Sequence, residues 1–164
     1  MHVTALQRFF AAEGLSVTPS TRERYQRVLA HLLHYLDTVD VAPYLGTGPA
    51  TLLASERQFV SENAFFRIFG FDELVCCLEG FVEPRHLLPK RGEARSQVRL
   101  VEKLLKRLRR DQLIDMPVVA CAYFDAEEAV ARARRFLASH AAQDMTDDWL
   151  ERPALRVIPG GRTE

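Results

Sequence analysis

The sequence predicts an all-α fold, a single-domain orthogonal helical bundle over residues 1–150, and three observations lead to that prediction. Apolar residues recur at spacings of three and four in most segments, which is the period of a buried helix stripe. Prolines and glycines gather in short clusters between those segments, where one helix would end and the next begin. The 164 residues, 48% hydrophobic and 27% charged, suffice for one globular domain with its own core.

The first two predicted helices are separated by a short turn. Residues 3–13 carry apolar side chains on one helical face, and Gly14 follows where a C-cap glycine would lie. After the turn, Ser20 and Glu23 match a capping box, so the second helix is expected to begin at about Thr21. Its predicted buried stripe is Tyr25, Val28, Leu29, Leu32, Leu36 and Val39.

The middle of the chain is predicted to hold a connection and two helices. Residues 41–50 contain two prolines and two glycines and are expected to connect elements, with a third helix starting near Pro49. Asp72 is expected to cap the next short helix, which runs to about Phe81. A phenylalanine cluster between them could form core, a ligand pocket or a partner surface, and the large area that aromatic rings bury favours the core: Phe65, Phe66, Phe69 and Phe71.

Histidine and cysteine positions predict neither a metal site nor a redox centre. His31 and His34 lack nearby carboxylate or thiol partners, so both are expected to be exposed on the second helix. Cys76 and Cys77 have leucine, valine and glutamate neighbours, which would not activate a thiol, and are expected to be small buried fillers. With Cys121 the cysteines number three and form no C-x-x-C pair, which predicts a reducing cytoplasm rather than a disulfide framework.

The C-terminal third is predicted to hold one helix and a tail. Acidic residues that precede a run of arginines match the helix macrodipole and predict a helix over residues 126–140. The apolar run 118–124 before it fits either a strand or a helix entry. Residues 151–164 contain proline and glycine and are expected to form a loosely held tail.

Neither a membrane span nor a cleaved leader is predicted. No run of about 18 apolar residues occurs, and the N-terminal segment has early charge without a small-residue cleavage site. A soluble cytoplasmic protein with no membrane partner is therefore expected.

One predicted helix, over residues 94–111, concentrates positive charge in a chain of zero net charge. Residues 85–110 hold 10 basic and 2 acidic side chains, whereas residues 1–84 and 111–164 each hold 6 basic and 10 acidic ones. At 100° per residue the apolar stripe centres near 280° and the basic stripe near 100°, on the opposite face. The apolar stripe is Val98, Val101, Leu104, Leu105 and Leu108.

The informative property of this helix face is the sign of its charge. Most surface helices alternate lysine with glutamate at i,i+4, but here like charges stand at residues 95, 99 and 103 and again at 106 and 110. Such repulsion is mildly destabilising, so the pattern favours an anionic partner such as a nucleic-acid backbone. Two alternatives stay open: docking on the acidic helices of the same chain, and docking on an acidic protein.

Two segments resemble the SAM-like core-binding domain of phage-integrase-type tyrosine recombinases. LQRFFAAEGLSVTPSTRERYQRVLAHLLHYL resembles the start of that domain, and ARSQVRLVEKLLKRLRRDQLID resembles its last, basic helix. The likeness spans about residues 3–115 and implies a four-helix DNA-clamping bundle, with residues 126–140 as an additional helix. That family's chemistry needs a separate catalytic domain, whose arginines, His-x-x-Arg element and tyrosine nucleophile have no counterpart after residue 115.

The function predicted from these observations is non-enzymatic DNA binding through the basic helix, with double-stranded DNA as the expected partner. No glycine-rich phosphate loop, metal-ligand cluster or nucleophile–base spacing is legible, so no catalytic residue, metal or cofactor is assigned. The alternatives are a protein-interaction or oligomerisation module and an enzyme whose site is assembled from distant residues. The predicted nucleic-acid-binding residues are Lys90, Arg91, Arg95, Arg99, Lys103, Lys106, Arg107 and Arg110.

Overall fold

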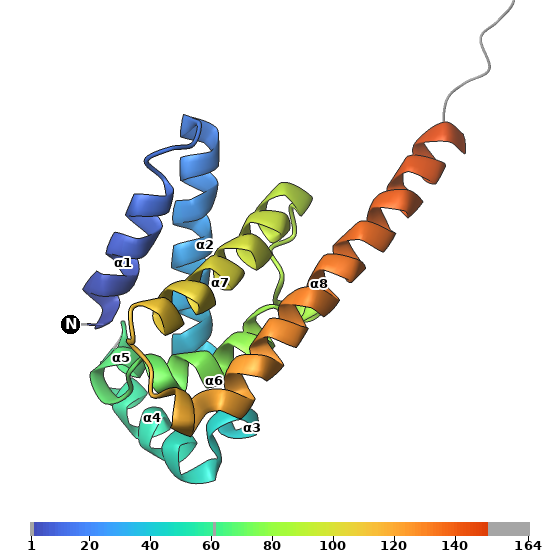
Figure 1. Ribbon diagram of the computed structural model, residues 1–164. Helices are drawn as coiled ribbons and strands as arrows, with labels where there is room; N and C mark the ends of the chain where they lie inside the picture. The colour runs from blue at the N-terminus through green and yellow to red at the C-terminus, as the bar shows by residue number, and fades with distance from the viewer. Residues whose placement is uncertain (1, 61, 151–164) are drawn as a thin grey trace, which may run out of the picture.

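The computed structural model describes residues 2–60 and 62–150, with side chains to residue 140, and confirms the prediction of an all-helical bundle (Figure 1). Residues 151–164, the predicted tail, lie outside the described part. In chain order the elements are α1 (His2–Glu13), α2 (Pro19–Thr38), α3 (Ala42–Leu45), α4 (Thr47–Phe59), α5 (Ala64–Ile68), α6 (Phe71–Phe81), the 3₁₀ helix η1 (Pro84–His86), α7 (Arg91–Arg110) and α8 (Met116–Leu150).

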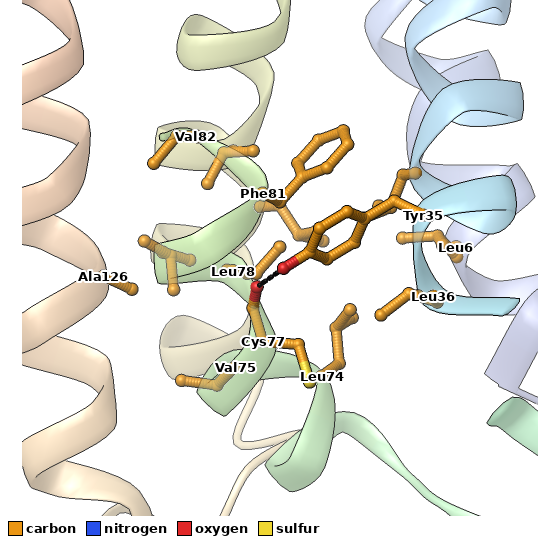
Figure 2. Close-up of a cluster of buried hydrophobic side chains, with 14 of the residues drawn as sticks. Leu6, Tyr35, Leu36, Leu74, Val75, Cys77, Leu78, Phe81, Val82 and Ala126 are labelled. Carbon is orange, nitrogen blue, oxygen red and sulfur yellow. Dashed lines mark hydrogen bonds between the residues drawn. The ribbon is translucent and has the colours of Figure 1, made fainter. Parts of the chain in front are cut away.

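Helix α6 forms the centre of the core, between α2 and α8 (Figure 2). Leu74, Leu78 and Phe81 have no exposed surface, because this short helix is apolar on nearly every side. From α2, the Tyr35 hydroxyl donates a hydrogen bond of 3.3 Å to the Cys77 carbonyl oxygen. Helix α8 packs along both α6 and α7, so the core holds α7 and α8 side by side.

The phenylalanine cluster and the paired cysteines belong to this core. Phe65 is fully buried and Phe66 and Phe71 are nearly so, which confirms the core interpretation of the aromatic segment. Cys77 is fully buried and Cys76 partly so, and burial raises the pKa of both thiols above the usual range. A thiol with a raised pKa is a poor nucleophile, as expected of a packing residue.

Helix α2 starts earlier than predicted and is capped differently. Helix α2 begins at Pro19, and the Thr18 hydroxyl accepts a hydrogen bond of 3.4 Å from the Thr21 amide, so the predicted capping box of Ser20 and Glu23 is wrong. Proline at the first helical position has no N–H to satisfy, which lets the helix start two residues earlier.

Helix α6 is likewise capped differently from the prediction. Its N-cap is Gly70, whose amide donates a 2.9 Å hydrogen bond to the Glu73 carboxylate. Asp72 does not cap this helix; its carboxylate accepts a 2.9 Å hydrogen bond from the amide of Asp115, just before α8. A carboxylate expected to act locally therefore joins two segments distant in sequence.

The proline- and glycine-rich segment 41–50 contains helices where only a connection was predicted. Helix α3 occupies Ala42–Leu45 and α4 starts at Thr47 rather than near Pro49. Only Gly46 separates them, at a φ of 84°, a left-handed value that a glycine adopts without strain. The prolines lie in the first turn of each helix, where a missing N–H costs nothing.

Helix α8 is longer than predicted at both ends. It begins at Met116 and continues to Leu150, so the predicted helix 126–140 is only its middle and the ambiguous run 118–124 is helical. Its buried positions recur every three or four residues and face α6 and α7: Val119, Tyr123, Ala126, Ala129, Val130 and Ala133. Past the bundle the helix continues outward (Figure 1).

Buried hydrogen bonds fix the connection between α6 and α7. The Gln97 side chain, fully buried, donates to the Phe81 and His86 carbonyl oxygens at 2.8 and 3.1 Å and accepts from the Leu88 amide at 2.9 Å. His31 Nε2 also donates to the His86 carbonyl oxygen, at 2.7 Å. The prediction of two exposed histidines is therefore wrong for His31, which is half-buried by this contact, and His34 alone is exposed.

Candidate nucleic-acid interface

Helix α7 buries its predicted apolar stripe and leaves the basic stripe on the surface. Val98, Val101, Leu104, Leu105 and Leu108 are each at most 2% exposed. The helix therefore has the rotation about its own axis that the spacing predicts. Helix α8 runs alongside α7 (Figure 1).

A groove of about 460 Å³ lies between α7 and α8, and we refer to it as the basic groove. Among the residues whose side chains the structure describes, five cations and one carboxylate line it, together with Val98, Leu137 and Ala138. The charged residues are Arg95, Arg99, Lys103 and Lys106 from α7, Arg134 from α8, and the acid Glu102. Cations from two helices facing one concave space would bind an anion from both sides.

The predicted binding residues divide into three places. Four of them, Arg95, Arg99, Lys103 and Lys106, line the basic groove. Lys90 is the N-cap of α7 and Arg91 its first residue, beside a second recess at that end. Arg110 and Arg107 lie at the C-terminal end of α7. Both bind the Asp111 carboxylate and hold the pKa of that carboxyl below its usual range.

Ion pairs neutralise part of the positive charge in the basic groove. Lys103 binds Glu13 of α1, and Lys106 binds Glu102 at 2.8 Å. The Lys103–Glu13 ion pair is a contact between the basic helix and another helix of the same chain, which is one of the alternatives that the sequence left open. Among the described residues, Arg95 and Arg99 make no ion pair and are exposed, so their charges face solvent at the groove wall.

Glu102 is the electrostatic centre of the groove. Its carboxylate accepts a hydrogen bond from Lys106 and another from Arg134 across the groove. The Lys106 hydrogen bond, with that of Arg134, outweighs partial burial and lowers the pKa of Glu102. The carboxylate therefore stays charged throughout the neutral and mildly acidic range and holds the two helices together.

Arg134 and Glu13 are site residues that the sequence alone did not reveal. The run of arginines at 132–135 was visible, but periodicity does not show which of them faces α7. Arg134 reaches Glu102, whereas Arg132 binds Glu79 of α6 at 3.1 Å on the other side of α8. The rotation of α8 relative to α7 decides which arginine faces the basic groove, and no local sequence pattern specifies that rotation.

The described part of the chain has neither a membrane-spanning helix nor a cluster of metal-ligating side chains. Residues 2–60 and 62–150 contain no helix that is both long and apolar enough to span a membrane. Among residues 2–60 and 62–140, no three histidine, cysteine, aspartate or glutamate side chains lie close enough to share a metal ion.

No family model matches the chain, and no curated protein or solved structure matches it significantly. The geometry and charge of the basic groove therefore provide the basis for a functional assignment.

Proposed function

We propose that this protein is a non-enzymatic DNA-binding module that holds the phosphate backbone in the basic groove. The observation that supports this best is the lining of the groove, in which five cations stand against one carboxylate. Glu102 and Glu13, which binds Lys103 from α1, cannot together neutralise five cations, and phosphates are the anions that repeated arginines and lysines bind best.

The spacing of the cations suits a linear polyanion. Arg95, Arg99 and Lys103 follow one another at intervals of four residues, so each stands about 6 Å further along the helix axis. Each phosphate neutralised in this row would release condensed counterions and add affinity that depends on salt but not on base sequence. Because Arg95 and Arg99 make no ion pair among the described residues, no internal contact has to break before they bind.

Neutralising the groove is expected to remove most of the DNA affinity. In the triple variant Arg99→Gln, Lys103→Gln, Lys106→Gln, the affinity for a labelled random-sequence DNA should fall at least tenfold at low salt. The slope of log affinity against log salt should become shallower by about one to three, because each phosphate contact contributes up to about 0.9 and the carboxylates displaced from Lys103 and Lys106 take up cations in return. Fluorescence anisotropy at several salt concentrations measures both quantities.

A matched control removes the same charge elsewhere. Arg67, Arg85 and Arg132 are exposed and paired with acids outside the basic groove, so replacing all three by glutamine changes net charge equally. This control should keep most of the affinity of the unmodified protein. Equal losses in both triple variants, or none in either, would remove the basic groove from consideration.

Replacing the groove's carboxylate should strengthen binding. Glu102→Gln frees Lys106 and Arg134 for phosphate, and the affinity for DNA is expected to rise roughly tenfold at low salt, since each exposed ion pair is worth up to about 1 kcal/mol. The control Glu56→Gln removes an equal charge from α4, where Glu56 binds Arg67. If both variants bound DNA equally well, long-range charge rather than the groove would explain the gain.

A protein-partner function has one observation in its favour. On α4, Leu52 and Phe59 lie seven residues apart on one face and are 54% and 84% exposed. The aromatic segment around Phe65 does not offer such a surface, because it is buried. Light scattering of the protein without DNA would show whether these two side chains hold copies together.

A further inference from the structure

A second recess, of about 280 Å³, lies beside the basic groove towards the start of α7. Leu137 of α8 lines both spaces, so they are neighbours that share this side chain as a wall. The walls of the second recess are largely apolar and come from three parts of the chain. The segment before α7 supplies Leu87 and Leu88, α7 supplies Ala94, and α8 supplies Phe136 and His140.

Phe136 and His140 form an aromatic pair beside this recess. Their ring centroids are 4.0 Å apart with planes tilted by 40°, one helical turn from each other. A carbonyl oxygen can only accept, so the 3.0 Å contact to the Phe136 carbonyl oxygen makes His140 Nδ1 the donor and fixes the ring. His140 is exposed and Phe136 is partly exposed, so a flat aromatic ligand could stack on the outer side of this pair.

The shape of the basic groove bears on which form of DNA enters it. The axes of packed helices are roughly 8–10 Å apart, so the space between α7 and α8 is narrow. A duplex is a broad convex rod and would rest on the rims, touching the groove with one row of phosphates. An unpaired strand can enter, and Arg99 of α7 and Arg134 of α8 would then flank its phosphates.

We propose that the ligand of the basic groove is single-stranded DNA, one base of which stacks on Phe136 and His140 in the adjoining recess. This inference rests on the proposed function. It joins the two features that sequence-tolerant single-strand binding needs, a cationic track for the backbone and an aromatic platform for a base. The cations Arg95 to Lys106 form the track, and the recess adjoins its Arg95 end, where Ala94 lines the recess and Leu137 lines both spaces.

The test compares a labelled 20-nucleotide thymidine strand, a duplex of the same length, and a strand of the same length built from abasic sugars. The intact protein should bind the thymidine strand more tightly than the duplex. The double variant Phe136→Leu, His140→Gln keeps side-chain bulk but loses both rings. It should lose about fivefold to a hundredfold in affinity for the thymidine strand, the usual range for one stacked base.

Two further readouts separate stacking from charge. The double variant should bind the duplex and the abasic strand as the intact protein does, and its salt slope should be unchanged because no phosphate contact is removed. Circular dichroism of both proteins confirms equal folding. If the double variant binds the thymidine strand as tightly as the intact protein, or if the intact protein prefers the duplex, the inference is wrong.

The outcomes also distinguish this inference from the function on which it rests. Suppose the groove triple variant loses DNA binding while the double variant binds the thymidine strand unchanged. The DNA-binding function then stands and the single-strand inference fails. If the intact protein binds neither form even at low salt, the DNA-binding function itself is overturned.

Discussion

Replacing Gln97 by alanine is expected to lower the free energy of unfolding by about 3 kcal/mol. The fully buried side-chain amide of Gln97 accepts a hydrogen bond from the Leu88 N–H and donates one to the Phe81 carbonyl oxygen. Both backbone groups would lose this partner. Each buried backbone group left without a hydrogen bond costs about 1–3 kcal/mol. The His86 carbonyl oxygen is less affected, because it also accepts from His31.

Urea unfolding followed by circular dichroism measures this loss, with Gln7→Ala as the control. Gln7 is exposed on α1, so its replacement should change stability by less than about 0.5 kcal/mol. Similar stabilities for the two variants would show that the Gln97 hydrogen bonds contribute little. A functional effect should accompany the loss, because Gln97 holds the segment that carries Leu87 and Leu88 at the edge of the proposed base-stacking recess.

Replacing Gly80 by alanine is expected to destabilise the protein by about 2 kcal/mol, although alanine is the better helix former by about 1 kcal/mol. A methyl group at Gly80 would lie 2.0 Å from the Tyr44 hydroxyl oxygen and 2.5 Å from that of Tyr35. Tyr35 is buried and hydrogen-bonded to the Cys77 carbonyl oxygen, so it cannot move without breaking that contact. Overpacking of this kind typically costs 1–3 kcal/mol.

Thermal unfolding compares Gly80→Ala with the control Gly48→Ala. Gly48 is also helical, in α4, but no atom lies within 4 Å of an added methyl group there. The control should be as stable as the unmodified protein or slightly more stable. If Gly80→Ala were stabilised to the same extent, the close packing of Tyr35 and Tyr44 over α6 would be contradicted.

The sequence predicted best the features that depend on one helix alone. The stripe from Val98 to Leu108 is buried as its spacing requires, because a long amphipathic helix has only one face that a core can accept. Helix starts were less predictable. Thr18 and Ser20 are both good capping residues, and the backbone around Pro19 decides between them.

The composition of the candidate site was predicted only in part, for a different reason. A helical wheel places Arg110 on the same face as Arg99, but it contains no information on Asp111, which binds Arg107 and Arg110 at the end of α7. The wheel also omits Arg134, which lies 24 residues further along the chain than Arg110 and reaches the basic groove from α8. Contacts between helices determine which charges remain available.

The two ion pairs of Glu102 place a carboxylate that cannot diffuse away beside the proposed phosphate site. A phosphate that bound Lys106 and Arg134 would displace this carboxylate, which would then attract a cation from solution. That uptake would offset part of the counterion release that favours binding. If the groove binds DNA, its five cations should therefore give a weaker salt dependence than their number suggests, and the displaced carboxylate would favour rapid release of the DNA.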